Sequence, residues 1–479
     1  MSANAKAKPT TSSSRSGQQG SKRTVAERPS DTRAEHYKAG RALRESCSRE
    51  AHAAWKAPKG RPGAVELILA AEKGRVPDLL PLRHGRMVRS AFTFYRGAAL
   101  TMATDLAGTP TTGIRVQCCG DAHLCNFGGF ATPERRLIFA INDLDETLPA
   151  PWEWDVKRLA ASFVVGCRDN GLSEAVAKDV VLTCVRSYRE SMAEFSQLKT
   201  LELWYRSIGA EELMAEAPPK LRKRIMKRIE KERAKSRGEE MFPKLAEHKG
   251  DNPVIKDQLP TIFHHKDVPP GQIHQAVRDV LAAYVATLPS AYQALASRYK
   301  LYDAAIKVVG VGSVGTLCWV LLFMAGDDDP LFLQVKEARA SVLERYAGKS
   351  VFPNHGQRVV DGYRRMQPAS DMLLGWSQGP KRHFFIRQLR DMKLSAMVET
   401  FGQAEMDLYA GWCGRALALS HARSGNSAML SGYMGKSDAL DKAIAAFSKA
   451  YADQNEKDHA ALDKAVRKGT VEAVFEEER

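Results

Sequence analysis

The sequence lacks the features of a secreted or membrane-spanning protein. No secretory signal opens the 479-residue chain, and its eight cysteines include no CxxC pair. We therefore expect reduced thiols rather than a disulfide framework. No apolar run approaches the ~18 residues that a membrane span needs. These absences predict a cytoplasmic protein with no membrane span.

The first 35 residues have almost no large apolar side chains, and they carry seven Lys or Arg against three acids. Such a segment cannot bury enough surface to offset the entropy of ordering it. We expect a disordered basic tail at 1–35, which either solubilises the protein or binds nucleic acid.

The composition as a whole is that of a globular protein, 44% hydrophobic and 27% charged, with a net charge of +15. Such a surplus favours anionic partners but does not choose among nucleotides, nucleic acid and acidic lipid.

Each of two short apolar runs predicts a buried strand that ends at polar side chains. The run at 114–119 is followed by Asp121, and Asn126 comes five residues later. The run at 137–141 ends at Asp143. Two strands that each present an acid at a loop can hold carboxylates and an amide around a divalent metal, whose preferred ligands are oxygens.

This order of residues is typical of the catalytic and metal loops of kinases. We assign Asp121 and His123 as catalytic, with Asp121 as the base that orients a hydroxyl. Asn126 and Asp143 are the candidate Mg²⁺ ligands, with Asp145 as an auxiliary ligand. A metal-binding or purely structural turn is the plainer alternative.

A glycine motif lies between two further predicted strands at 306–309 and 317–323. It contains Gly310, Gly312, Ser313 and Gly315. A dinucleotide-binding fold also uses such a motif, but there a helix follows it. Here another apolar strand follows, which favours a glycine loop that closes over phosphates.

The next strand carries Lys336, which we expect to contact the phosphates of ATP. In kinases a glutamate pairs with this lysine, and both Glu337 and Glu344 are candidates. The strand predicted at 382–391 would lead into the linker that meets adenine in kinases.

Basic residues also cluster outside these motifs. We expect Arg83 and Arg89 to pair with acids, whereas Arg86 and Arg96 are candidates for anion binding. Residues 219–237 predict a basic amphipathic helix, which either is solvated or binds nucleic acid or a membrane surface. His264 and His265, with no spaced partners, are a weak metal signal.

The order of these motifs is the reverse of that in ordinary kinases. Asp121 and Asp143 precede Gly310 and Lys336 by about 190 residues, and the helix expected to lead into the catalytic loop lies at 407–424. A circularly permuted kinase fold would explain this order.

The wording GDAHLCN followed by INDLDE resembles the motifs of aminoglycoside phosphotransferase-like kinases. His123 matches the second histidine of that family, and Cys119 stands where it has the first. The resemblance implies that Asp155 braces the catalytic loop; the residues themselves indicate that Asp155 caps a helix. With NDLDETLPAPWEWDVKRLAAS, the chain also resembles the uncharacterised bacterial domain-of-unknown-function 2252 family from about residue 36 onward.

We therefore expect an α+β, helix-rich, two-lobed, protein-kinase-like fold that is circularly permuted. The function expected is an ATP- and Mg²⁺-dependent phosphotransferase with an unknown acceptor. The alternatives are nucleotidyl transfer, a non-catalytic protein that binds nucleotide or nucleic acid, and, last, a metal hydrolase. The expected parts are a tail (1–35), a helical lobe (36–300), a β-rich nucleotide lobe (301–395) and C-terminal helices that complete the helical lobe (396–479).

Overall fold

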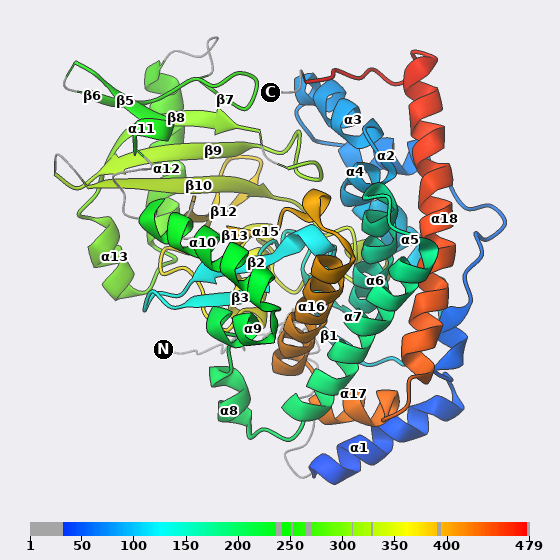
Figure 1. Ribbon diagram of the computed structural model, residues 1–479. Helices are drawn as coiled ribbons and strands as arrows, with labels where there is room; N and C mark the ends of the chain where they lie inside the picture. Colours follow the sequence, from blue (N-terminus) through cyan, green and yellow to red (C-terminus); the bar gives the residue numbers. More distant parts are fainter. Residues whose placement is uncertain are drawn as a thin grey trace, which may run out of the picture.

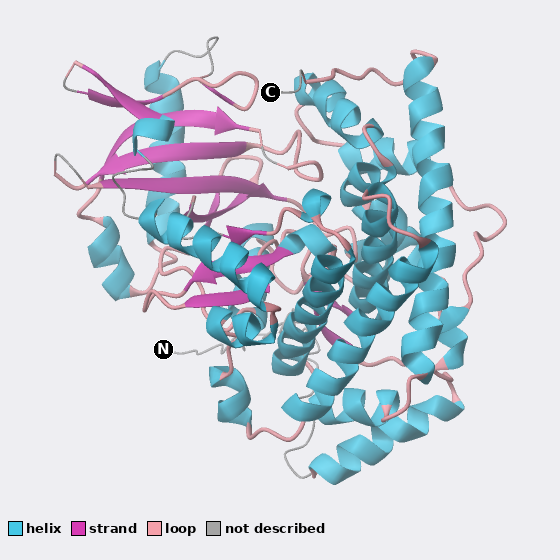
Figure 2. Cartoon of the chain, in the orientation of Figure 1, coloured by secondary structure: helices cyan, strands magenta, loops and turns pink. Residues whose placement is uncertain are grey.

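The computed structural model describes residues 32–235, 242–250, 252–264, 270–308, 310–326, 329–389 and 394–476 (Figure 1). The architecture is mixed α+β, as expected. Most helices gather on one side of the molecule and most strands on the other (Figure 2). Within the described residues, no helix is both long and apolar enough to cross a membrane.

Helices alone precede the first strand. They are α1 (Arg33–Ala42), α2 (Ala64–Glu72), α3 (Leu80–Val88), α4 (Ala91–Gly97) and α5 (Ala99–Leu106). Thr32 caps α1, and its side chain and that of Glu35 satisfy each other's backbone N–H groups. The expected tail therefore extends too far, since a helix starts at Arg33; residues 1–31 lie outside the described residues.

The helical side is built around α6, which is buried along almost its whole length. Neighbouring helices cover α6 from several sides, and α16 also packs along α7 (Figure 1). This group consists of α6 (Trp152–Asp169), α7 (Glu174–Phe195), α16 (Gln403–Ser424), α17 (Ser427–Met434) and α18 (Ala439–Arg467). The helix predicted at 407–424 corresponds to α16, and α16, α17 and α18 all lie in the stretch 396–479 where C-terminal helices are expected.

Two small sheets carry the first set of motifs. Strand β1 (Arg115–Cys118) pairs with β4 (Leu148–Pro151). Strands β2 (Phe127–Ala131) and β3 (Leu137–Ile141) form an antiparallel hairpin. The short β13 (Leu394–Ser395) adds to the edge of β2. Every residue of β3 is buried, which is why its sequence is a continuous apolar run.

The second set of motifs lies on a six-stranded antiparallel sheet in the order β11-β12-β10-β9-β8-β7. Its strands are β7 (Ile262–Phe263), β8 (Lys300–Lys307), β9 (Cys318–Met324), β10 (Pro330–Ala338), β11 (Gly375–Gln378) and β12 (His383–Gln388). The predicted strand, glycine turn, strand and further strand correspond to β8, the loop after it, β9 and β10.

The remaining elements cover this sheet or the edges of the helical side. They are α8 (Thr200–Tyr205), α9 (Ala210–Glu216), α10 (Pro219–Lys235), α11 (Phe242–Leu245), β5 (Ala246–Lys249), β6 (Asn252–Ile255), α12 (Pro270–Val285), α13 (Ser290–Ala296), α14 (Glu344–Ala347) and α15 (His355–Met366). Helix α10 is the basic helix expected at 219–237.

The boundary predicted between residues 300 and 301 cuts through the sheet unit. Strand β7 belongs to the sheet. Tyr284 of α12 lies in the same hydrophobic cluster as Leu321 of β9 and Phe384 of β12. The β-rich unit therefore begins before residue 301. Local periodicity could not reveal this, because a helix is assigned to a unit only by what it packs against.

Candidate functional site

The two sets of motifs meet at one cleft of about 360 Å³ between the sheet and the helical side. The first set contributes five residues, namely Asp121, His123, Asn126, Asp143 and Asp145. The glycine loop contributes Gly310, Gly312 and Ser313. Gly315 is not part of the lining. Its hypothetical Cβ would instead lie 3.1 Å from Cβ of Arg75, behind the loop.

Lys336 joins the two sets directly. Its Nζ lies 2.5 Å from Oδ2 of Asp145 and 3.6 Å from Oδ2 of Asp143. The lysine side chain is only 3% exposed, whereas those of Asp143 and Asp145 are 34% and 26% exposed. The carboxylates therefore open to the cleft while the ammonium group supports them from inside the protein.

Neither glutamate predicted for Lys336 is its partner. Glu337 follows Lys336 in β10, so its side chain points to the opposite face of the sheet, where it pairs with Arg382 at 2.6 Å. Glu344 lies near Lys349 and His355. The expectation of a Lys–Glu pair is wrong, and the two aspartates take that place.

The charges around Lys336 shift the pKa values of both partners. Burial disfavours the Lys336 ammonium group, but Asp143 and Asp145 outweigh it and raise its pKa. Burial and the neighbouring Asp143 raise the pKa of Asp145, and Lys336 opposes that shift. The site thus keeps a charged lysine against a carboxylate pair whose mutual repulsion favours a further cation.

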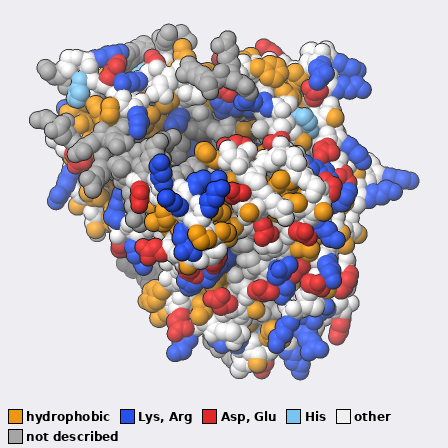
Figure 3. Space-filling model, viewed as in Figure 1, with side chains coloured by type: hydrophobic (Ala, Val, Ile, Leu, Met, Phe, Trp, Pro, Cys, Tyr) orange, Lys and Arg blue, Asp and Glu red, His pale blue; other side chains and the backbone are white. Residues whose placement is uncertain are grey.

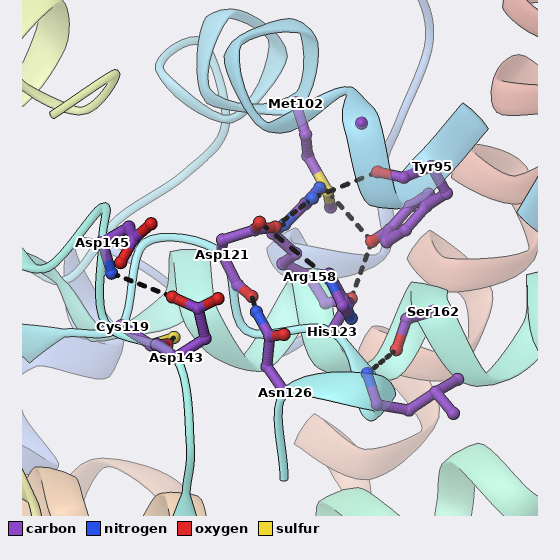
Figure 4. Close-up of polar contacts among 12 residues, drawn as sticks. Tyr95, Met102, Cys119, Asp121, His123, Asn126, Asp143, Asp145, Arg158 and Ser162 are labelled. Carbon is purple, nitrogen blue, oxygen red and sulfur yellow. Dashed lines mark hydrogen bonds and ion pairs between the residues drawn. The ribbon is translucent and has the colours of Figure 1, made fainter. Parts of the chain in front are cut away.

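Asp121 is held from one side, which leaves one oxygen facing the cleft (Figure 4). Arg158 of α6 donates from Nε at 2.7 Å, and also from Nη2, to Oδ1. Nε2 of His123 lies 3.9 Å from the other oxygen, Oδ2. The glycine loop also reaches this point, because a Cβ on Gly312 would lie 4.0 Å from Oδ2.

His123 stays neutral near pH 7. Burial, with help from Arg96 and Arg158 and against the influence of Asp121, lowers its pKa to about 4. Its Nδ1 is buried without a hydrogen-bond partner among the residues that the structure describes. His123 is thus a neutral group beside Asp121 rather than a cation.

Asn126, Asp143 and Asp145 fit the requirements of a divalent metal. The side-chain NH₂ group of Asn126 donates to the backbone carbonyl of Asp121 at 2.8 Å. The side-chain oxygen of Asn126 therefore points away from that carbonyl. The backbone N–H of Asp145 donates to Oδ1 of Asp143 at 3.3 Å. Oδ1 of Asp145 is buried and has no hydrogen-bond partner in the part of the chain that the structure describes. An unsatisfied buried carboxylate oxygen is costly unless a ligand meets it.

Asp155 does not cap α6, because the helix starts at Trp152 and Asp155 lies within its first turn. Its carboxylate instead accepts from the backbone N–H groups of Cys119 and Gly120, at 2.5 and 3.0 Å. It therefore braces the loop that presents Asp121, as the resemblance implied. Ring Nε2 of His421 lies 3.2 Å from the same carboxylate.

Cys118, Asp155 and His421 form the one group of three metal-ligating side chains found among the described residues. All three are buried and already have partners. The Cys118 thiol donates to the carbonyls of Ala150 and Pro151, and His421 also contacts the hydroxyl of Tyr188. This group holds the loop in place and leaves no open position for a substrate.

The glycine loop is anchored to the N-terminal helices. Arg86 donates to the carbonyl of Gly310 at 2.7 Å, and Arg75 donates to that of Val314 at 2.5 Å. The backbone N–H of Val76 donates to the carbonyl of Gly315 at 2.7 Å. The loop thus lies close over Asp121.

Three of the four arginines discussed in the sequence can be placed by their contacts. Arg83 pairs with Glu72 at 2.8 Å, as expected, and Arg86 pairs with Glu476 at 2.6 Å. Arg96 lines the cleft. Arg86 therefore supports the loop rather than the cleft itself.

His264 is not part of a metal site. Its two ring nitrogens contact Asp257 and Asp303 at 2.8 and 3.0 Å, and the pair with Asp303, despite partial burial, raises its pKa to about 9. His265 lies outside the described residues.

Sequence reasoning gave no role to Arg158 or His421. Arg158 stands in a quoted motif and His421 lies in the helix predicted at 407–424, but their partners, Asp121 and Asp155, are distant along the chain or lie on another element. Only a count of charges could have hinted that Asp121 needs a buried cation.

Comparison with known proteins identifies the class. The family model described as an uncharacterised protein conserved in bacteria, DUF2252, matches residues 75–465, so this chain belongs to that family. Searches of the curated proteins and of the solved structures found no match.

Proposed function

We propose that the protein is an ATP-dependent phosphotransferase with a circularly permuted kinase-like fold. The observation that carries the proposal is the contact of Lys336 with Asp143 and Asp145, since these residues are about 190 positions apart in the sequence. A lysine, a carboxylate pair and a glycine loop around one cleft are the parts that grip a triphosphate in kinases.

The order of the sheet agrees with this proposal. A hairpin of β8 and β9 carries the glycine loop, β10 carries the lysine, and β12 and β11 follow beyond it. Helix α15 lies between β10 and β11 in the chain and packs on β11 and β12. This is the arrangement of glycine loop, lysine strand and helix expected of a nucleotide-binding lobe.

Contacts at the end of α16 support permutation. The hydroxyl of Ser424 accepts from the backbone N–H of Gln117 in β1 at 3.2 Å. A Cβ on Gly425 would lie 2.6 Å from Cγ1 of Val116, so this close approach needs glycine. The helix that ends at Ser424 thus reaches the strand that leads to Asp121, although the chain does not connect them there.

The residues can be assigned to a balanced reaction. The acceptor hydroxyl oxygen would attack the γ-phosphorus of ATP and form a new P–O bond. The bond from that phosphorus to the bridging oxygen would break, and this oxygen would keep the electron pair in ADP. Oδ2 of Asp121, beside the neutral His123, would take the hydroxyl proton, while Arg158 holds Oδ1 in place.

The phosphates would be gripped from two sides. Gly310, Gly312 and Ser313 would cover them by backbone, and Lys336 would balance part of their charge. Asn126, Asp143 and Asp145 would hold Mg²⁺, whose chemistry here is to neutralise charge on the phosphates.

Replacing Asp143 by Ala tests this assignment. We expect a loss of Mg²⁺-dependent ADP release of about 100-fold or more, because a metal ligand is removed while the buried core is kept. Asp463→Ala, on the partly exposed end of α18, is the matched control and should leave turnover unchanged. Melting curves check that both variants fold, and retained turnover in Asp143→Ala would remove this residue from the mechanism.

A non-catalytic protein that binds nucleic acid is the second candidate, and the charge of α10 favours it. Lys and Arg gather over this helix in Figure 3. Those of its basic residues that are described as exposed are Lys220, Arg222, Lys223, Arg224 and Lys227. Salt-sensitive nucleic-acid binding without Mg²⁺-dependent protection by ATP would support this candidate. Release of pyrophosphate in place of ADP would indicate nucleotidyl transfer.

A further inference from the structure

The cleft is lined by arginines that have no carboxylate partner among the described residues. They are Arg75, Arg96, Arg339 and the exposed Arg345. Arg75 donates to the carbonyls of Ala71 and Val314, and Arg339 donates to those of Ala71 and Lys73. A carbonyl oxygen offers only a partial charge, so these hydrogen bonds do not neutralise the guanidinium groups.

The acids of the cleft form no ion pair with these arginines among the described residues, because most of them have other partners; Glu344 lies near Lys349 and His355, and Glu146 acts on Arg75 without pairing with it. Asp121 is held by Arg158, and Glu337 by Arg382. Lys336 forms ion pairs with Asp143 and Asp145. Glu146 accepts from the backbone N–H of Val342 at 2.7 Å.

The crowding of positive charge affects Arg75. Burial, together with the neighbouring Arg83 and Arg339, lowers its pKa to about 9, against the influence of Glu146 and Glu72. Arg83 has Glu72 as its partner, but Arg339 has none among the described residues. Like charges held together in a partly buried cleft are stabilised by an anion from solution.

Arg96 lines the cleft together with Asp121 and Gly312. Its guanidinium lies over the ring of Phe92 at 5.9 Å, and its Nε is buried without a hydrogen-bond partner among the described residues. A Cβ on Gly312 would lie 3.2 Å from the Arg96 carbonyl and 4.0 Å from Oδ2 of Asp121. The backbone of Arg96 therefore lies against the glycine loop close to Asp121, and its side chain lines the cleft that Asp121 also lines.

We propose that the acceptor is a small hydroxyl compound that carries its own anionic group, a phosphate or a carboxylate, and that Arg96 binds this group with help from Arg75 and Arg339. That this compound is a phosphoryl acceptor rests on the proposed function. The anion site itself does not depend on catalysis. A cleft of about 360 Å³ shared with a triphosphate leaves room for a small molecule.

Calorimetric titration with inorganic phosphate and with acetate tests the site. The intact protein is titrated alone and after saturation with a non-hydrolysable ATP analogue and Mg²⁺. We expect one of the two anions to bind in both states, and Arg96→Gln to weaken that binding by about 10-fold or more, since a guanidinium fork is lost. The preferred probe tells a phosphate group from a carboxylate.

Two variants sharpen the result. Arg298→Gln removes an exposed arginine of the sheet side and should leave anion binding unchanged. Arg96→Lys keeps the charge and should restore part of the affinity.

Equal anion binding by Arg96→Gln and the unaltered protein would overturn the proposal. Competition between the anion and the ATP analogue would also overturn it, because the arginines would then serve the phosphates of the nucleotide. Anion binding that depends on Arg96, in a protein that does not bind the analogue, would keep the anion site and refute the proposed function.

Discussion

At the scale of single residues, the charge of Lys336 is the centre of the site. Its ammonium group is buried, and the carboxylates of Asp143 and Asp145 are its partners. Removing one member of a buried ion pair leaves the others uncompensated, which costs more than the pair itself contributes. Here the uncompensated groups would be two carboxylates close to each other.

Lys336→Met should therefore lower the free energy of unfolding by about 3 kcal/mol. Because Mg²⁺ can take over part of the lost positive charge, millimolar Mg²⁺ should restore part of that stability. Chemical denaturation with and without Mg²⁺ measures both effects. Lys349→Met changes a lysine that is 83% exposed and is the control. A variant as stable as the control, or one indifferent to Mg²⁺, would contradict this account of the site.

Residue types and spacing led us to expect that several of these side chains lie together, because polar residues that follow buried strands stand at the ends of those strands. Asp121, Asn126 and Asp143 line the cleft, and Lys336, which is not part of the lining, contacts Asp143 from behind it. The partner of Lys336 was not predictable in the same way. Two glutamates near it in sequence were plausible, but alternation along β10 turns Glu337 away, and only the fold brings Asp145 within 2.5 Å.

At the scale of elements, the glycine loop is held by segments from both ends of the chain. Arg86 of α3 donates to Gly310 with one nitrogen and to the carboxylate of Glu476 with two others, at 2.8 and 2.6 Å. The segment after α18 also contacts α3 through the backbone N–H of Val474, which donates to the Pro81 carbonyl. Glu476 thus orients the arginine that steadies the loop.

Glu476→Gln should loosen the glycine loop without unfolding the protein. Loss of a bidentate pair of this exposure should lower the free energy of opening the loop by about 1 kcal/mol. Hydrogen exchange at residues 310–317 should therefore become roughly fivefold faster. Exchange in α6 should stay the same. Glu472→Gln, in the same segment, is the matched control, because only its backbone carbonyl is used, by His84. Equal exchange in the two variants would show that Glu476 does not support the loop.

The elements that local pattern predicted best are those with strong periodicity or bounding glycines. Strand β9 and helix α16 lie within a few residues of where they are expected, whereas β8 begins at Lys300, six residues before the predicted strand. The two-residue strands β7 and β13 were not predicted, because their pairing with β8 and β2 depends on distant partners. The capping role expected of Asp155 failed for the same reason, since its partners Cys119 and Gly120 belong to another loop.

At the scale of the whole molecule, chain order and spatial order differ. Helix α16 ends against β1, where Ser424 contacts Gln117, 307 residues earlier, and the glycine loop lies over the loop of Asp121, which precedes it in the chain. Motif order alone could suggest permutation but could not establish that the parts meet. The contact of Lys336 with both aspartates provides that link.

If one triphosphate bridges these parts, both must respond to it together. A non-hydrolysable ATP analogue with Mg²⁺ should slow hydrogen exchange at residues 119–126 and 310–317 in the same titration, with the same midpoint, because a single binding event closes both sides. The analogue without Mg²⁺ should protect more weakly. Asp143→Ala, which keeps the fold but loses a metal ligand, should shift both midpoints equally. Protection confined to one of the two segments, or two different midpoints, would mean that the segments do not share a ligand, and the kinase-like assignment of the cleft would fail.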